Sequence, residues 1–241
     1  MIIKTRGIVL RARKYSETSV IADIFTETKG LRSYIVSGVR AQNPKIGAAL
    51  LQIMTPLEMV AYHREDRDLT RLKEVKALHP FHSIPFDVRK GAVGMFMTEV
   101  ARKTIQGHEE NPALFRFLLD TFVFLDETTQ SAANLHLHFM VSLSGHLGFL
   151  PGGTYSDTTP YFDMKDGLFS DVQPAHGHWL PPPYSKYLGL LLSLPMEKCH
   201  EMALNRDERK HLLGELLNYY RLHIENFPEI HAHQVLEEVL G

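Results

Sequence analysis

The sequence has 241 residues, which is enough for one large domain or two smaller ones. Its hydrophobic content of 44% and charged content of 22% are ordinary for a soluble globular protein. No apolar run reaches the roughly 18–20 residues that a bilayer-spanning helix needs. The N-terminus also lacks the apolar core and cleavage site of a signal peptide, so we expect a cytoplasmic protein that does not bind membranes. The single cysteine, Cys199, excludes an internal disulfide and a cysteine-based zinc site.

The charges are distributed unevenly along the chain. Residues 1–80 hold 14 of the 26 Lys and Arg but only 8 of the 28 Asp and Glu, so the other 12 and 20 lie in the remainder. A basic N-terminal part and an acidic C-terminal part predict two domains with different partners. Polyphosphate suits the basic part, because each Lys or Arg that binds a phosphate releases a counterion. Uneven surface charge without function is the alternative.

The first 80 residues have the pattern of a small β-barrel. Five segments show features of strands: 3–13, 20–25, 31–36, 57–62 and 70–78. Residues 48–51 are compatible with one helical turn, and residues 63–68 form a charged turn. Five short strands with an irregular stretch between the third and fourth favour an OB-fold, which binds nucleic acid strands through a basic groove and stacking aromatic rings. An SH3-like barrel has a similar periodicity.

The second and third predicted strands form a hairpin around which we place the candidate binding surface. Lys29-Gly30 connects them, and glycine supplies a positive φ at little cost. One face of segment 31–36 combines Arg32 with Tyr34, and Arg40 and Lys45 follow in a glycine-containing loop. This layout is suited to holding a polyanion. An ordinary hairpin with solvated charges would show the same pattern.

The pattern becomes helical after a short connector between Pro80 and Pro85. The expected helices lie at 87–107, from Asn111-Pro112 onward, at 131–148, at 184–194, after a capping-box pair formed by Asn205 and Glu208, and from about His233. The helix at 131–148 is apolar on most sides, so we place it at the centre of this part. The fold class is therefore α+β, with an OB-fold domain at 1–80 and a helical domain at 81–241.

A β-hairpin is expected inside the helical part. Residues 149–184 are rich in proline, glycine and threonine, and Asp166-Gly167 separates two apolar runs, which is a strong signal for a hairpin turn. We treat this region as an insertion in the helical domain.

The sequence offers little support for catalysis. Of its 14 histidines, several form H-x-H pairs, and the pair His176 and His178 lies in an expected loop. No carboxylate or thiol motif completes a metal site around that pair, and no nucleophile elbow, P-loop or zinc-protease motif is present. We therefore expect no enzymatic activity, no metal and no cofactor. A His-dependent metallohydrolase is the weakest of the alternatives.

Several short motifs, taken in order, resemble the RecO family. They are Gly7-Ile8-Val9-Leu10-Arg11, Tyr15-Ser16-Glu17-Thr18-Ser19, Ile24-Phe25-Thr26-Glu27-Thr28-Lys29-Gly30, Gly38-Val39-Arg40, Lys45-Ile46-Gly47-Ala48-Ala49-Leu50 and Leu217-Asn218-Tyr219-Tyr220-Arg221-Leu222-His223-Ile224. The resemblance spans the whole chain and is densest in the first 60 residues. It agrees with an N-terminal OB-fold and a C-terminal helical domain.

The resemblance implies a bacterial mediator of DNA repair and recombination. Such a protein would bind single- and double-stranded DNA and anneal strands coated by single-stranded DNA-binding protein (SSB), whose acidic C-terminal tail it would dock. With RecR it would assist loading of RecA. Many members carry two CxxC pairs that bind zinc, but this sequence has no cysteine there. We expect a zinc-free hairpin braced by Tyr161, Phe162, Phe169 and Trp179.

We assign the DNA contacts as a hypothesis. Arg11, Arg13, Lys29, Arg32, Arg40 and Lys45 are expected to bind phosphates, and Tyr34 is the candidate platform for a base. No motif marks the site for the SSB tail. Lys90, Arg102 and Lys103 on the first predicted helix are interpreted as a solvated face. An OB-fold module that binds RNA is the main alternative function.

Overall fold

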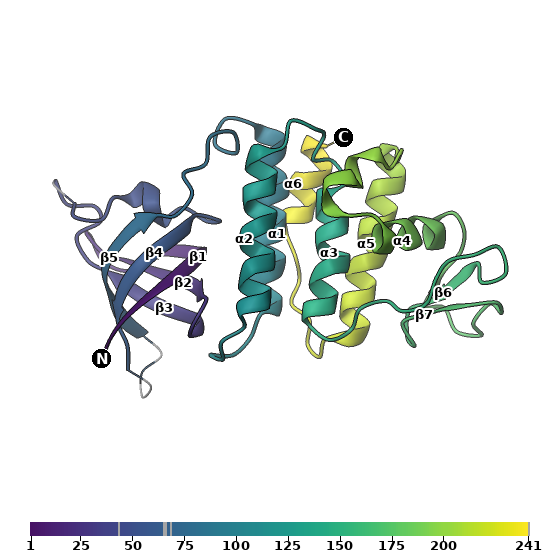
Figure 1. Cartoon of the computed structure of the whole chain (residues 1–241), viewed down its shortest axis with the longest axis horizontal. Helices are drawn as coiled ribbons and strands as arrows, with labels where there is room; N and C mark the ends of the chain where they lie inside the picture. Colours follow the sequence, from purple (N-terminus) through teal and green to yellow (C-terminus); the bar gives the residue numbers. More distant parts are fainter. Residues whose placement is uncertain (43, 65–66, 68, 241) are drawn as a thin grey trace. The chain divides into compact units, whose positions relative to one another are not determined.

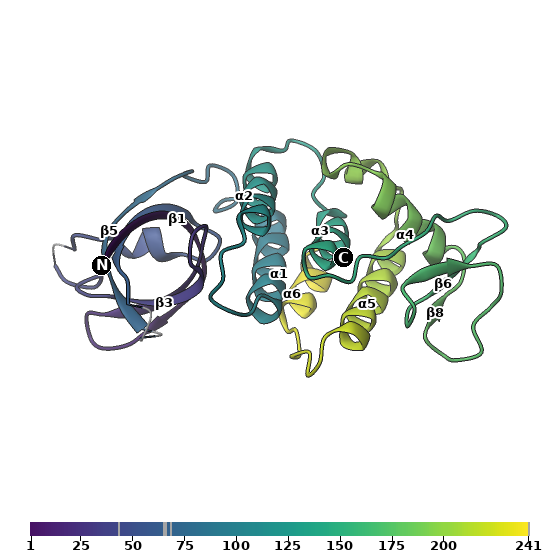
Figure 2. The ribbon, with the colours of Figure 1, turned by 60° about the horizontal axis from the view of Figure 1, so that its bottom comes forward.

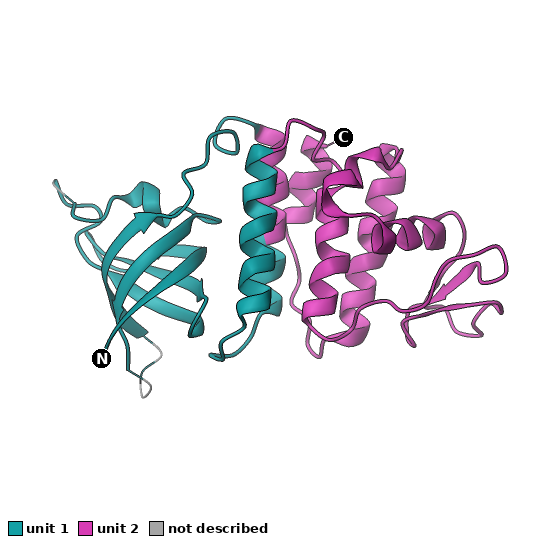
Figure 3. Ribbon diagram, in the orientation of Figure 1, with its two compact units in different colours: residues 1–87, 98–127 teal, residues 88–97, 128–241 magenta. Residues whose placement is uncertain are grey.

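The computed structural model describes residues 1–42, 44–64, 67 and 69–240. The chain forms two compact units, shown in different colours in Figure 3. Unit 1 comprises residues 1–87 and 98–127, and unit 2 comprises residues 88–97 and 128–241. Residues 98–127 thus belong with the N-terminal barrel in this division. The domain boundary at residue 80 stays a prediction.

The N-terminal part of unit 1 is a closed five-stranded barrel with the order β1-β2-β3-β5-β4. Its strands are β1 (Ile2–Lys14), β2 (Val20–Thr26), β3 (Gly30–Val36), β4 (Pro56–Tyr62) and β5 (Leu69–Ala77). A short parallel pairing of β3 with β5 closes the ring, which Figure 2 shows nearly end-on. The predicted α+β class and the OB-type barrel are confirmed. The predicted charged turn at 63–68 lies partly outside the described residues.

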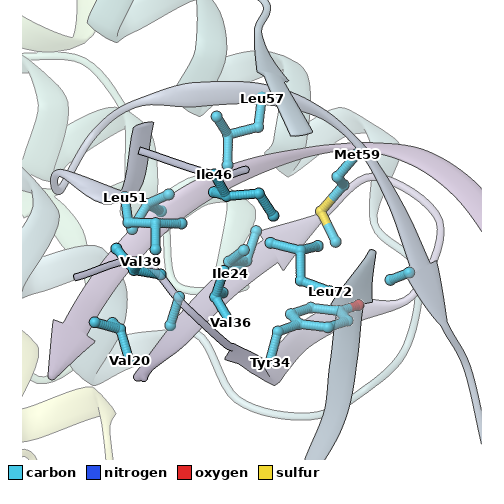
Figure 4. Packing of buried hydrophobic residues seen from close by; sticks show 13 residues of the cluster. Val20, Ile24, Tyr34, Val36, Val39, Ile46, Leu51, Leu57, Met59 and Leu72 are labelled. Atoms are coloured by element: carbon cyan, nitrogen blue, oxygen red, sulfur yellow. The ribbon is translucent and has the colours of Figure 1, made fainter. Parts of the chain in front are cut away.

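The barrel core is made by alternate side chains of each strand. In Figure 4, Ile24, Tyr34, Val36 and Leu72 lie together inside the barrel, and none of them is more than 4% exposed. The irregular segment between β3 and β4, which includes the 3-10 turn η1 (Ala48–Leu51), contributes Leu51 to the same core. The face of β3 that carries Tyr34 is therefore the inner face.

The outer face of the first two strands is also apolar and buried. Ile8 of β1 pairs with Phe25 of β2, and both are at most 2% exposed. The Phe25 ring lies 6.3 Å from that of Phe115 on α2 (Pro112–Glu127), and the guanidinium of Arg6 lies 5.5 Å from the centre of the same Phe115 ring. The barrel thus has apolar positions on both sides of its sheet.

The loop that follows α1 (Val88–Thr104) is attached to the start of β3. The Leu31 amide donates to the Gly107 carbonyl at 3.3 Å, and His108 Nδ1 donates to the Leu31 carbonyl at 2.8 Å. Gly30 makes this approach possible. Its φ is +60°, and a Cβ at this position would lie 2.4 Å from the carbonyl oxygen of Glu109.

We expect Gly30→Ala to destabilise unit 1 by about 2–3 kcal/mol, because alanine adds left-handed strain and a clash with backbone atoms. Gly38→Ala is the matched control, since Gly38 has φ +73° but a Cβ added there would meet no atom within 4 Å. Gly38→Ala should be destabilised by the left-handed strain alone, by about 1 kcal/mol. Hydrogen exchange at barrel amides over a series of urea concentrations measures both losses within unit 1. Equal losses in the two variants would show that the loop contact contributes nothing.

Unit 2 is built around α3 (Leu135–His146), which is buried on nearly all sides as predicted. It lies beside α5 (Arg206–His223), and the Tyr220 hydroxyl donates to the Met140 carbonyl at 2.7 Å (Figure 1). The capping box of Asn205 and Glu208 is confirmed. The remaining helices are α4 (Tyr184–Ser193), the 3-10 helix η2 (Met196–Glu201) and α6 (Ala232–Val239). Among the described residues, no helix is long and apolar enough to cross a membrane.

The predicted hairpin is present as part of a three-stranded sheet with the order β7-β6-β8. Its strands are β6 (Tyr161–Asp163), β7 (Leu168–Ser170) and β8 (Trp179–Leu180). Phe162 lies 5.1 Å from Phe169 and Tyr161 lies 5.5 Å from Trp179, measured between ring centroids. The four aromatic residues therefore brace the hairpin as predicted. That the hairpin holds no zinc stays a prediction.

Candidate nucleic-acid interface

The C-terminal end of β1 is open to solvent. Residues 11–14 are all exposed, and the loop to β2 is closed by a hydrogen bond from the Tyr15 amide to the Ser19 carbonyl at 2.9 Å. Arg11 and Arg13 therefore extend from the sheet surface. Tyr15 is 59% exposed. The strand end thus presents two guanidinium groups and an aromatic ring together.

A second basic loop lies against the first. The Arg40 amide donates to the Thr18 carbonyl at 3.3 Å, which joins the loop after β3 to the loop between β1 and β2. Arg40 and Lys45 are both exposed. Within the described part of the chain, neither has a carboxylate partner. Lys29 lies in the β2–β3 turn, where its carbonyl accepts a hydrogen bond from Arg32 Nε at 3.2 Å.

A groove in unit 1 joins three of the five barrel strands to the end of α1. It is lined by Arg13, Asp23, Leu31, Arg32, Ser33, Arg102, Gly107 and His108. Arg102 reaches it because the following loop is hydrogen-bonded to Leu31. Concave surfaces lined by charges of one sign concentrate the field and attract counter-ions. Three arginines against one aspartate make this groove suited to an anion.

The aspartate in the groove is partly compensated. Asp23 Oδ1 accepts a hydrogen bond from the Ser33 hydroxyl at 2.6 Å, and Asp23 Oδ2 lies 4.0 Å from Arg11 Nη1. Arg11 is therefore tied to a carboxylate, whereas Arg13 and Arg102 have no ion-pair partner among the described residues. The last two are the guanidinium groups most available to a phosphate.

Tyr34 does not lie at this surface. Its side chain is fully buried in the barrel, and burial raises the pKa of its hydroxyl to about 12. That hydroxyl has no hydrogen-bond partner among the described residues. The expectation that Tyr34 stacks on a base is corrected, because its strand face points into the core. Tyr15 is the exposed aromatic residue that sequence reasoning missed, although it directly follows the basic run at 11–14.

The three basic residues that we interpreted as a solvated helix face have three different environments. Lys90 is 8% exposed, and its Nζ donates to the Thr128 carbonyl at 2.7 Å. Lys103 pairs with Glu99 at 2.6 Å. Arg102 lines the groove. The interpretation is wrong for Lys90, whose ammonium group binds the carbonyl of the residue that follows α2, and for Lys103, whose side chain is only 14% exposed.

Unit 2 contains a separate pocket between α3, α5 and α6. Leu213, Leu236 and Leu240 line its apolar part, and His136, Arg206, Arg209, Lys210 and Glu237 complete it. Lys210 pairs with Glu237 at 2.8 Å, and Arg209 donates to backbone carbonyls. Arg206 is exposed and has no ion-pair partner in the described chain. Burial and the nearby Arg209 charge lower the pKa of His136 to about 3, so its ring is neutral.

The histidines do not assemble a metal site in the part of the chain that the structure describes. Among those residues, no group of three or more His, Cys, Asp or Glu side chains could hold a metal ion. In the hairpin loop, His176 Nε2 lies 3.1 Å from Asp163 Oδ2, and the His176 and His178 rings are 6.2 Å apart. The imidazole of His176 thus pairs with one carboxylate.

Comparisons with known proteins agree over the whole chain. A family model described as "Recombination protein O N terminal" matches residues 1–81, and "Recombination protein O C terminal" matches residues 85–229. Proteins named "DNA repair protein RecO" from Phocaeicola vulgatus and Bacteroides fragilis are 34% and 35% identical, over 100% and 99% of both chains. The protein of the same name from Flavobacterium psychrophilum is 37% identical over 100% of both.

The likeness to solved structures is weak. Asparaginyl-tRNA synthetase from Entamoeba histolytica is 15% identical, and the match covers 61% of this chain and 43% of that one. Its TM-score of 0.25 is too low to support an argument about fold or function.

Proposed function

Since the chain belongs to the RecO family of DNA repair proteins, we propose that it is a recombination mediator. It binds single- and double-stranded DNA, anneals complementary strands coated by SSB, and with RecR assists the loading of RecA. Its place of action is the bacterial cytoplasm, at the nucleoid. The observation that supports DNA binding best is the cationic surface of unit 1, where Arg13, Arg40 and Lys45 are exposed without carboxylate partners among the described residues.

The contacts expected on this surface are mainly to phosphates. Arg11, Arg13, Lys29, Arg32, Arg40 and Lys45 supply the positive charge, and Tyr15 takes the stacking role that the sequence favoured for Tyr34. Phosphate contacts carry affinity without sequence information, so binding is nonspecific and weakens as salt rises. Stacking of a base on Tyr15 adds about 1–3 kcal/mol.

Annealing requires no bond chemistry. Two strands must be held close while their phosphate charge is screened, and a cationic surface does this without a nucleophile, a general base or a cofactor. We therefore propose that the protein is not an enzyme. RecR is included on the basis of the family, and no residue is assigned to it.

We assign the SSB tail to the pocket in unit 2. A peptide that is acidic and ends in apolar residues needs an apolar cavity beside a cation. Half-buried Leu240 supplies the accessible apolar surface, since Leu213 and Leu236 in the same lining are buried, and Arg206 supplies the cation. Arg206 is also the first residue of α5, where the helix dipole favours a carboxylate.

The test is strand annealing with oligonucleotides precoated by SSB, with and without the SSB C-terminal tail. We expect annealing of both, and faster annealing when the tail is present. Arg206→Glu should anneal full-length SSB complexes as slowly as the unaltered protein anneals tailless ones, while uncoated strands anneal normally.

Absence of annealing with either SSB would overturn the mediator proposal. Tighter binding to structured RNA than to single-stranded DNA would support an RNA-binding module instead. Normal tail dependence in Arg206→Glu would remove the tail from this pocket and leave the mediator proposal intact.

A further inference from the structure

We propose that the groove between the barrel and the end of α1 is a phosphate-binding cleft, and that Arg102 is a DNA-binding residue that acts together with Arg13. This inference rests on the proposed function and extends the contact surface beyond the barrel strands. We also infer that the carboxylate of Asp23 repels DNA phosphates and so limits the affinity of the protein for DNA.

The position of Arg102 is fixed by the contacts of the loop that follows it. Residues 107–108 form two hydrogen bonds with Leu31, at the part of β3 that precedes its pairing with β5. Gly30 permits the close approach of Glu109. Arg102 lies in the last turn of α1, directly before this anchored loop. The guanidinium of Arg102 therefore lies at the groove on the end of a helix that is anchored to β3 by hydrogen bonds of the following loop.

The charges in the groove are suited to a phosphodiester. Arg13 comes from β1 and Arg102 from α1, and neither has an ion-pair partner in the described chain, so both can donate to phosphate oxygens. The Ser33 hydroxyl is committed to Asp23. A phosphodiester carries one negative charge and no acidic proton, so guanidinium donors on two sides satisfy it without any proton transfer.

Asp23 opposes the same ligand. Its carboxylate lines the groove, and it also holds Arg11 at 4.0 Å. Replacing it by asparagine keeps an acceptor for the Ser33 hydroxyl, removes the repulsion and releases Arg11. Asp23→Asn should therefore bind DNA more tightly than the unaltered protein. A gain of affinity that vanishes at high salt is the opposite of the loss expected if the substitution merely disrupted the groove.

The experiment is binding of a fluorescent oligo-dT strand, followed by anisotropy over a series of salt concentrations. Homopolymeric DNA excludes annealing from the readout. We expect Arg102→Glu to weaken binding on the order of tenfold at low salt and to reduce the slope of log K against log salt by about 0.7, the value for one phosphate contact on a single strand. Arg102→Lys should weaken it about twofold, because lysine keeps the charge but loses the planar fork.

Two further variants make the result decisive. Asp23→Asn should strengthen binding by about threefold or more at low salt, with the effect vanishing at high salt. Arg221→Glu, at an exposed position on α5, applies the same change in net charge as Arg102→Glu outside the groove and should leave affinity within about twofold.

The outcomes separate this inference from the proposed function. If the unaltered protein does not bind oligo-dT, the proposed function fails. If it binds, but Arg102→Glu and Asp23→Asn bind as it does, the groove is not a phosphate site. Equal losses in Arg102→Glu and Arg221→Glu would likewise overturn the inference, because net charge alone would explain them.

Discussion

Reversing the charge of two loop residues, Arg40→Glu with Lys45→Glu, is expected to weaken the binding of single-stranded DNA by about 30- to 100-fold at low salt. Both side chains are exposed and lie on the loop after β3. Each reversal removes one counterion-releasing contact and adds a repulsive charge. The slope of log K against log salt should fall by about 1.4, so the difference from the unaltered protein should shrink as salt rises.

A matched double variant controls for net charge. Lys186→Glu with Arg221→Glu reverses two exposed charges in unit 2, on α4 and α5. We expect its affinity to stay within about threefold of the unaltered protein, because neither residue belongs to the proposed interface on unit 1 and a change of net charge alone is weakened by salt screening. Equal affinity of the Arg40/Lys45 variant and the unaltered protein at low salt would remove these two residues from the interface.

The β-barrel could be predicted from the sequence because the alternation of apolar and polar residues is a local signal. Which face of each strand points into the core could not be predicted. Segment 31–36 has apolar residues on both faces. The structure explains this pattern, since the outer face of the neighbouring strands also packs, through Phe25, against Phe115 of α2. When both faces are apolar, a period of two does not say which one is the core. The pattern alone therefore does not tell whether Tyr34 points into the core or outward, and the interpretation of Tyr34 as an exposed residue is wrong.

The groove shows a different limit of sequence reasoning. Arg102 and Arg13 are far apart in the chain, and both line one groove because residues 107–108 bond to Leu31. Helical periodicity predicts only which face of a helix is buried. Neither periodicity nor the count of charges predicts a contact between residues that are far apart in the sequence. Tyr15 is the opposite case. Its place after four mostly basic residues is visible in the sequence and is a local signal for an exposed aromatic ring beside positive charge.

The connector between the barrel and α1 depends on one carboxylate, so we expect Asp126→Ala to destabilise unit 1 by about 3–5 kcal/mol. Asp126 is 4% exposed and accepts hydrogen bonds from the backbone amides of His82, Ser83 and Ile84 at 2.8–3.1 Å. Its Oδ2 also lies 3.4 Å from His79 Nε2. Alanine would leave three buried or half-buried amide groups without an acceptor.

The same carboxylate predicts a pH dependence. Burial raises the pKa of Asp126, but the hydrogen bonds from His82, Ile84, Ser83 and His79 outweigh burial and bring it to about 2. A pKa that is lower in the folded state than in the unfolded state adds stability above the unfolded value. This contribution, about 2 kcal/mol, is present above about pH 4 and is lost as the pH falls toward 2.

The measurement must distinguish the two units. The only tryptophan, Trp179, lies in unit 2, so its fluorescence reports on that unit. Hydrogen exchange at barrel amides reports on unit 1. We expect Asp126→Ala to speed exchange in the barrel at pH 7, and the difference from the unaltered protein to shrink at pH 2–3. Asp126→Asn keeps the shape but replaces an acceptor by an NH₂ donor, so it should recover only part of the loss. A loss that is the same at both pH values would mean that packing, and not the charged acceptor, stabilises the connector.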